Sequence, residues 1–366
     1  MLSLKRPLFG ILWFCVLSAG IFSIAGVVLS VHLHHAGHDP RQTVAIMLSN
    51  FMADRLNLIL LPLFIGVVIA SVKGWLPGTR PEEKLGDACP GAPFCGFSDA
   101  LALVVYLVLI QTGLGFVQGA LCEIIGQPRI AQLPAAHCTL AALSSILLTL
   151  FALKVSKAPA AGILGFARVH ALLLPLCVLL VAGDALVESE IDNMQRGLFS
   201  YPDVLQQIMA GMLNEGLLSV FLLVVIAPLA EEIVFRGIIL KSFLRKYSPG
   251  RAIALSSIAF SLAHMDPMQI VSALGFGILL GWLYFETENL WLCILVHSSH
   301  NFLNYLVYHD SIPVHISGFS ALAAAKYQFQ PVWIDFLGVL LLGIGIAGIR
   351  MVAKRKWTAA ESKDPL

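Results

Sequence analysis

The sequence has little charge. Only 12% of its 366 residues are Asp, Glu, Lys or Arg, whereas about a quarter of the residues in a typical soluble domain are charged. Hydrophobic residues make up 58% of the chain, and the mean hydropathy is +0.85. This composition excludes an ordinary soluble domain and predicts a membrane protein that crosses the bilayer several times.

The signatures of common metal sites are also missing. No His-Glu-x-x-His motif, the usual zinc-protease arrangement, occurs anywhere in the chain. Cys89 and Cys95 are separated by five residues, which is not a standard zinc spacing. The net charge is only +1, so no basic excess indicates a nucleic-acid partner. The lipid bilayer is the expected partner.

Long apolar runs dominate the sequence. Ten of them reach or approach the roughly 17–25 residues that a helix needs to cross a bilayer. They lie at 8–31, 56–72, 99–121, 136–153, 168–187, 205–240, 252–265, 268–285, 290–308 and 333–350. We therefore predict an all-α fold, a polytopic bundle of about ten transmembrane helices.

The basic residues predict the orientation of this bundle. With the N-terminus inside, most of the 23 Lys and Arg residues fall in inside loops or in the C-terminal tail. This distribution follows the positive-inside rule. Both termini are therefore predicted to lie inside.

Two adjacent glutamates interrupt the sixth apolar run. Ionisable residues at membrane depth are costly, so Glu231, Glu232 and Arg236 mark a candidate functional site. Glu232 and Arg236 are four residues apart and can pair on one helix face. Glu231 is rotated by about 100° from that face. It can face a cavity, where desolvation would suit its carboxylate to general-base work. A purely structural charge cluster is the alternative.

Two later apolar runs carry further polar residues at helical spacing. Phe260 and His264 lie one turn apart on one face. His297 and Asn301 are also four residues apart, and both side chains can donate to a developing oxyanion. His300 shares part of that face and is a further candidate. Structural interhelical hydrogen bonding is the alternative for this group.

These polar groups form three motifs in a fixed order. The motifs are Glu231-Glu232-x-x-x-Arg236, Phe260-x-x-x-His264 and His297-x-x-x-Asn301. Together they resemble the three ordered motifs of the CPBP family. That family comprises CAAX prenyl endopeptidases and bacteriocin-processing or immunity proteins, also called Abi proteins. The resemblance covers about residues 205–308.

The resemblance implies an all-helical intramembrane protease. It implies a water molecule that is activated by Glu231 and His264. It also implies an oxyanion that is stabilised by His297 and Asn301. The supporting residues in this hypothesis are Glu232, Arg236, Phe260 and His300.

The same hypothesis divides the chain into three parts. Residues 1–200 form an N-terminal transmembrane bundle of about five helices. Residues 201–310 form the catalytic core that resembles the CPBP family. Residues 311–366 form the last transmembrane helix and a basic tail on the inside.

The residues alone leave the role of a metal open. Glu231, His264 and His297 could ligate zinc, since three protein ligands plus a water molecule are a normal catalytic set. A carboxylate–histidine pair could equally polarise water without a metal. Asn301 favours the second alternative, because asparagine is a poor zinc ligand. We therefore expect no cofactor and keep zinc on those three residues as the alternative.

A transporter, or an immunity protein that binds a partner without cleaving it, is the alternative from a different class. Buried Glu, Arg and His residues also form proton or substrate pathways. Asp184 and Gln111 in other predicted spans would fit such a pathway. Asn301 favours the protease, because a proton relay does not need it.

The substrate class follows only coarsely from this hypothesis. We expect a peptide or protein substrate, lipidated or otherwise associated with the membrane. Nothing in the chain indicates an endomembrane retention signal. A prokaryotic cell membrane is therefore the setting that we favour.

Overall fold

The computed structural model describes residues 96–127, 134–156, 169–198, 216–264, 267–308, 317–319 and 328–361. These residues form helices and short connections, and none of them lies in a strand. The predicted all-α fold is confirmed for this part of the chain.

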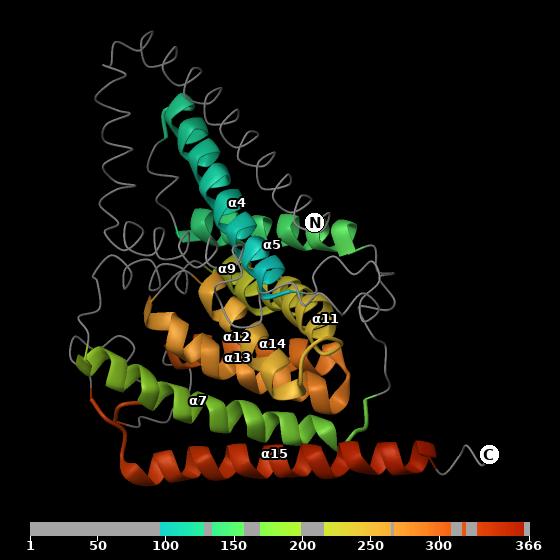
Figure 1. Cartoon of the computed structure of the whole chain (residues 1–366). Coiled ribbons are helices and arrows are strands. Elements are labelled where there is room, and N and C mark those ends of the chain that lie inside the picture. The colour runs from blue at the N-terminus through green and yellow to red at the C-terminus, as the bar shows by residue number, and fades with distance from the viewer. Residues whose placement is uncertain are drawn as a thin grey trace. The chain divides into compact units, whose positions relative to one another are not determined.

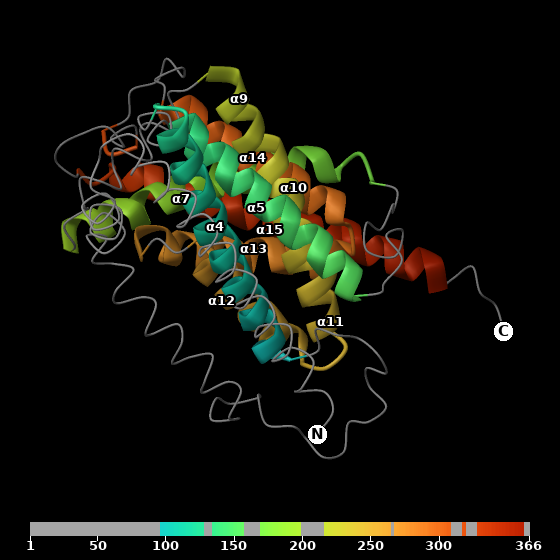
Figure 2. The same ribbon diagram turned by 90° about the horizontal axis from the view of Figure 1, so that it is seen from above.

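The chain forms two compact units. They are Met1–Ser156 and Lys157–Leu366. The described part of the first unit consists of α4 (Phe97–Ile124) and α5 (Pro134–Ser156), which pack against each other (Figures 1 and 2). Tyr106 of α4 and Phe151 of α5 make an aromatic contact, with ring centres 5.0 Å apart.

The second unit contains the polar motifs. A continuous helix, Gly216–Phe243, holds the glutamates and is followed by three helices that hold or face the histidines. The elements are α7 (Leu173–Leu198), α9 (Gly216–Phe221), η2 (Leu222–Ile226), α10 (Ala227–Glu232), η3 (Ile233–Leu240), α11 (Lys241–Phe243), α12 (Pro249–Ala263), α13 (Pro267–Thr287), α14 (Leu290–Tyr308) and α15 (Val332–Glu361).

Four helices in the described part of the chain are long and apolar enough to cross a membrane. They are Asp99–Cys122, Gly216–Phe243, Gln269–Thr287 and Val332–Ala353. These helices correspond to four of the predicted spans, and the shorter apolar helix Thr139–Lys154 lies in a fifth. The chain is therefore an integral membrane protein. The predicted spans 8–31 and 56–72 lie outside the described residues.

The predicted span 168–187 has the wrong bounds. The helix α7 begins at Leu173 and continues to Leu198, beyond the apolar run. Four acidic residues between positions 184 and 192 remain helical, and α7 is not among the four apolar helices. The apolar run ended before Glu188, whereas the backbone hydrogen bonding of a helix continues through charged residues.

The turns that join the later helices follow from local sequence. Pro249 begins α12, where its missing N–H costs nothing and its fixed φ suits the first helical turn. Asn289 precedes α14, and its Oδ1 accepts hydrogen bonds from the backbone N–H groups of Trp291 and Leu292 at 3.0 and 3.3 Å. This N-terminal cap fixes where α14 starts, and therefore which positions of α14 face the glutamates.

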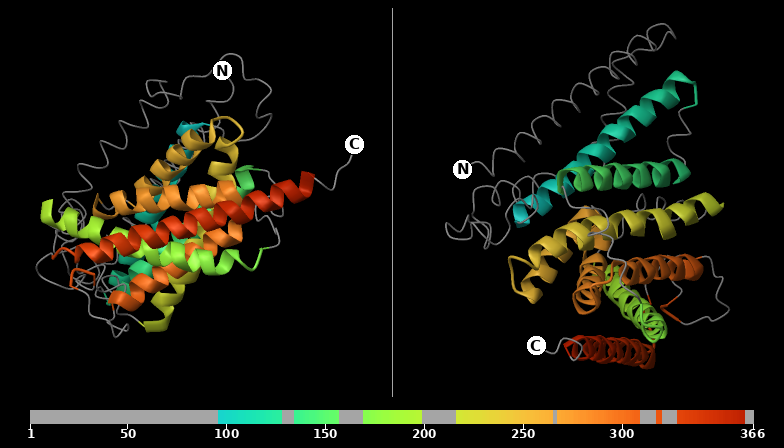
Figure 3. Two further views of the ribbon diagram at one scale, coloured as in Figure 1. Left: turned by 90° about the horizontal axis from the view of Figure 1, so that it is seen from below. Right: turned by 90° about the vertical axis from the view of Figure 1, so that its right-hand side faces the viewer.

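The helices α7 and α15 run side by side (Figures 1 and 3). Their backbones come close at Gly183. A Cβ atom added there would lie 2.5 Å from the backbone nitrogen of Leu342 and 2.8 Å from the carbonyl oxygen of Gly338. Small residues allow this close approach, which gives van der Waals packing between membrane helices.

We expect Gly183→Ala to destabilise this helix pair. The added methyl group meets backbone atoms, which cannot rotate away, and overpacking of this kind costs about 1–3 kcal/mol. Gly343→Ala on α15 is the matched control, because its Cβ would meet nothing within 4 Å. Thermal unfolding in detergent measures both variants. Equal melting temperatures for the two variants would contradict the close packing.

Candidate active site

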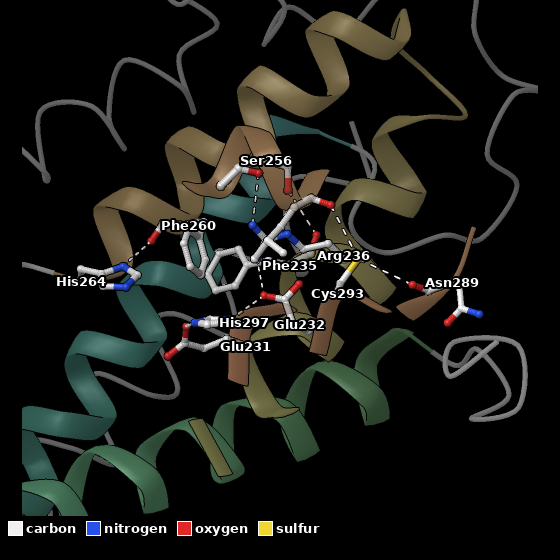
Figure 4. Close-up of polar contacts among 12 residues, drawn as sticks. Glu231, Glu232, Phe235, Arg236, Ser256, Phe260, His264, Asn289, Cys293 and His297 are labelled. Atoms are coloured by element: carbon white, nitrogen blue, oxygen red, sulfur yellow. Dashed lines mark hydrogen bonds and ion pairs between the residues drawn. The ribbon is translucent and has the colours of Figure 1, made fainter. Parts of the chain in front are cut away.

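The glutamates lie between two π-helical segments of the helix Gly216–Phe243. The segment η2 precedes them and η3 follows them, while α10 contains them. Short π-helical segments inside α-helices are frequent at functional sites, because they change the direction of side chains and free backbone groups. Figure 4 shows the side chains that gather around this stretch.

Glu232 and Arg236 form a buried ion pair. Arg236 Nη1 donates to Glu232 Oε1 at 2.7 Å, and the two side chains are 1% and 0% exposed. The pairing predicted from their spacing is confirmed. Arg236 Nη2 also donates to the carbonyl oxygen of Gly277 at 3.2 Å, and its guanidinium lies 4.4 Å from the ring centre of Phe260. The charge of Arg236 is therefore compensated from three sides.

Glu232 also binds a histidine from a different helix. The Nδ1 atom of His297, on α14, lies 2.8 Å from Glu232 Oε1. An ionised carboxylate only accepts hydrogen bonds, so Nδ1 carries the hydrogen. Glu232 thus holds Arg236 and His297 with a single oxygen atom. Its side chain is fully buried, so these two contacts take place away from solvent.

Glu231 differs from its neighbour in access and in partners. Its side chain is 26% exposed, and its Oε2 lies 4.0 Å from Nε2 of His297. This distance is too long for a direct hydrogen bond. His297 therefore presents one ring nitrogen to the buried Glu232 and the other toward the accessible Glu231. The two glutamates have the separate environments that their angular positions predicted (Figure 4).

His264 ends α12 and belongs to the same group of residues. Its Nδ1 lies 2.9 Å from the carbonyl oxygen of Phe260, one turn earlier. A carbonyl only accepts, so Nδ1 carries a hydrogen, and in the neutral ring the lone pair lies on Nε2. The Phe260 ring packs edge-on against both His264 and His297, with centres 4.8 and 5.9 Å apart. Phe260 therefore connects the two histidines.

Asn301 lies on α14, one turn beyond His297, and reaches the first π-helical segment. Its Nδ2 donates to the carbonyl oxygen of Leu223 at 3.0 Å. In this segment the N–H of Ala227 bonds to Leu222, five residues back. The next carbonyl, that of Leu223, would take the N–H of residue 228, but Pro228 has none. Asn301 satisfies the carbonyl that the proline leaves open.

The part of the chain that holds these residues matches a family of known membrane proteases. Residues 213–303, about a quarter of the chain, match the family model described as Type II CAAX prenyl endopeptidase Rce1-like. This segment of the chain is therefore similar to the CAAX protease family. The match contains all three motifs, as the resemblance to the CPBP family implied. No curated protein and no solved structure is similar enough to the chain to be matched.

The residues of the three motifs, which are Glu231, Glu232, Arg236, Phe260, His264, His297 and Asn301, are called here the CAAX protease motif cluster. His300 lies outside this cluster. It was a candidate for the working residue on α14, but its two ring nitrogens lie 3.2 and 2.8 Å from Asp184 and Glu188 of α7. A step of three residues rotates a side chain by about 300° around a helix axis, which is 60° away from the original direction. That rotation separates His300 from His297.

The residues proposed as zinc ligands are not the ones that converge. Among the described residues, the His, Cys, Asp and Glu side chains that meet at metal-binding distance are Asp184, Glu188 and His300. In the CAAX protease motif cluster, Nδ1 of His297 contacts Glu232 and Nδ1 of His264 contacts its own helix, which leaves Nε2 of each ring for water or for a metal ion. The metal-free site and the zinc alternative of Glu231, His264 and His297 therefore both stay predictions.

Sequence reasoning missed one contributor to this site and one residue of the neighbouring cluster around His300. The carbonyl of Gly277 supports Arg236, and backbone groups leave no signal in side-chain motifs. Glu188 was also missed, although Asp184 and Glu188 are four residues apart in a helix, the same spacing that singled out Glu232 and Arg236. The spacing of Asp184 and Glu188 was therefore a signal that the sequence contained.

We expect Glu232→Gln to unfold the protein far more readily than Glu231→Gln. The first change leaves Arg236 buried without its counter-charge, which typically costs about 3–5 kcal/mol. The second changes an accessible carboxylate without a close ion pair, so it should shift the melting temperature little. Thermal unfolding of both purified variants measures the difference.

A double variant serves as the control for this prediction. Glu232→Gln/Arg236→Met removes both charges, so it should be more stable than Glu232→Gln alone. Equal stability losses in Glu231→Gln and Glu232→Gln would contradict the division of roles between the glutamates.

Proposed function

We propose that the protein is an intramembrane endopeptidase that hydrolyses a peptide bond with an activated water molecule. The observation that carries the proposal is the contrast between the two glutamates. One is buried and holds Arg236 and His297, and the other is accessible beside the same histidine. The match of residues 213–303 to CAAX prenyl endopeptidases supports the same chemistry.

In the proposed first step, Glu231 and His264 activate water. Glu231 takes a proton from the water molecule while the oxygen of the water attacks the scissile carbonyl carbon. Nε2 of His264, the nitrogen that carries the lone pair in the neutral ring, positions the water as a hydrogen-bond acceptor. The proton held on Glu231 then passes to the leaving nitrogen as the carbon–nitrogen bond breaks.

In the same proposal, His297 and Asn301 stabilise the oxyanion. Because Nδ1–H of His297 is directed at Glu232, donation from Nε2 requires that the ring carry both hydrogens. The Glu232 carboxylate stabilises that charged ring, and a charged donor makes the stronger hydrogen bond to an oxyanion. Asn301 has two amide hydrogens, of which one goes to Leu223 and the other to the oxyanion.

We expect Glu231→Gln to abolish peptide cleavage and to leave the fold intact. Removal of a general base typically costs about 100- to 10,000-fold in rate. The assay follows cleavage of a peptide that ends in a C-a-a-X sequence, tested with and without a prenyl group on its cysteine. Glu288→Gln, an exposed acid between α13 and α14, is the control and should cleave at the wild-type rate.

The variant also identifies the substrate. Folded Glu231→Gln protein should retain cellular substrates, and these should be cleaved on addition of wild-type enzyme. Cleavage by Glu231→Gln at the wild-type rate would overturn the proposed mechanism. Capture of a partner that wild-type protein never cleaves would instead favour a binding or immunity protein.

The roles of Asn301 can be separated by a double variant. Asn301→Ala should lower kcat by about 100- to 1,000-fold if the amide donates to the oxyanion. The Asn301→Ala change also leaves the Leu223 carbonyl without its hydrogen-bond donor. Pro228→Ala supplies a backbone N–H that can satisfy this carbonyl. We therefore expect Asn301→Ala/Pro228→Ala to regain thermal stability but not kcat. Recovery of kcat in the double variant would show that Asn301 only satisfies the Leu223 carbonyl and does not donate to the oxyanion.

The finer features of the proposal extend beyond the described residues. We propose about ten spans with both termini inside, a transmembrane bundle at 1–200, the catalytic core at 201–310, and a last helix with a basic tail at 311–366. The substrate is a peptide or protein at the membrane, and the setting is a prokaryotic cell membrane.

We further propose that the site opens to the inside. Cysteines placed beside Glu231 should react with a polar thiol reagent that is applied from the inside, and not with one applied from the outside.

A further inference from the structure

A second cluster of ionisable side chains lies between α7 and α14. Asp184 and Glu188 face each other across His300, with Oδ2 of Asp184 at 3.2 Å from Nδ1 and Oε2 of Glu188 at 2.8 Å from Nε2. The ligand atoms of the three residues all lie within 4.8 Å of one another. The α7 residues lie outside the segment that matches the CAAX protease family.

Three buried atoms of this cluster, one from each residue, have no hydrogen-bond partner. His300 is only 5% exposed, and its Nδ1 has no hydrogen-bond partner although a carboxylate oxygen is 3.2 Å away. The same holds for Oδ2 of Asp184 and Oε2 of Glu188. The N–H directions of the ring therefore do not point at the carboxylates. Three potential donor atoms converge on one place and remain unsatisfied, which is costly in a buried setting.

The charge of the cluster is not balanced by the protein. The ion pairs of Asp184 and Glu188 in the described part of the chain are both with His300. Two carboxylates with a protonated imidazole have a net charge of −1, and with a neutral imidazole they have −2. Buried carboxylates without an equal number of cationic partners commonly coordinate a metal ion.

We propose that Asp184, Glu188 and His300 bind one divalent transition-metal ion. A neutral imidazole nitrogen and two carboxylate oxygens form a donor set that suits Zn²⁺ or Mn²⁺. The observed 3.2 Å between Nδ1 and Oδ2 is close to the roughly 3.4 Å that separates two ligands of a tetrahedral zinc ion. A divalent ion would neutralise both carboxylates and satisfy all three atoms.

Neighbouring side chains hold the ring of His300 in place for this role. Phe276 of α13 stacks on the ring with centres 4.3 Å apart, and the side-chain amide of Asn304 lies 2.9 Å from Nε2. When Nδ1 binds the ion, Nε2 carries the ring hydrogen, and the oxygen of that amide is the atom that accepts it. Contacts to the second ring nitrogen fix the orientation of metal-binding histidines. Glu188 is 26% exposed, which gives the ion a route to solvent and a place for a water ligand.

The site would connect α7 to the helix that carries His297. His297 and His300 leave α14 three residues apart, toward two different groups of carboxylates. A cation bound here is therefore structural for the catalytic unit and lies outside the peptide-cleaving steps proposed above.

Metal retention by the full-length protein tests the proposal. The protein in detergent is stripped with a chelator, loaded with Zn²⁺ or Mn²⁺ separately, passed through gel filtration and analysed for metal by mass spectrometry. We expect about one ion per chain in wild-type protein and at least a tenfold weaker affinity in His300→Gln and Glu188→Gln. Asp192→Asn, another acid on α7, is the matched control and should retain the ion.

Each other outcome overturns the inference. Wild-type protein that retains no ion would show that the cluster is held by protons alone. Equal retention in wild type, His300→Gln and Glu188→Gln would show an adventitious ion only. Loss of the ion in Glu231→Gln or His264→Gln, with His300→Gln unaffected, would place the metal in the CAAX protease motif cluster. Since retention is measured without substrate, failure of the cleavage assay leaves this test unchanged.

Discussion

The arrangement of the catalytic unit depends on one carboxylate oxygen. Oε1 of Glu232 accepts from Arg236 on its own helix and from His297 on α14, and its side chain is fully buried. In a low-dielectric interior such bonds are strong, and the loss of Glu232 or Arg236 leaves the other with a costly unpaired charge. The glutamate helix and α14 are thereby held in one register. This register places Nε2 of His297 beside Glu231. The contacts of the buried Glu232 therefore determine which side chain lies next to the accessible Glu231.

The proline in the same helix imposes a second constraint. Pro228 removes one N–H from the backbone just after the first π-helical segment, and in a membrane no water is at hand to replace it. Asn301 supplies the missing donor from α14. A polar side chain that can serve the oxyanion therefore also repairs a helix. The two roles are compatible because a primary amide has two hydrogens.

The sequence predicted the membrane character, the helical class and the different environments of the two glutamates. Composition determined the first two, and helical geometry the third, because residues four apart share a face wherever a helix forms. The bond between Glu232 and His297 could not be predicted in this way. It joins residues 65 positions apart, and its geometry depends on how α14 is capped and packed. The end of α7 was missed because hydropathy measures apolarity, while helices continue through acidic residues.

The histidines of α14 show why spacing alone could not assign them. His297 and His300 are both buried in the same helix, and both meet carboxylates. His297 meets a carboxylate that is already paired with Arg236, and its second ring nitrogen lies toward Glu231. His300 meets two carboxylates whose ion pairs in the described part of the chain are both with this histidine. One histidine therefore lies among the residues of the three motifs, and the other lies in a separate cluster with α7. The difference lies in the partners on the neighbouring helices, which only the packed structure supplies.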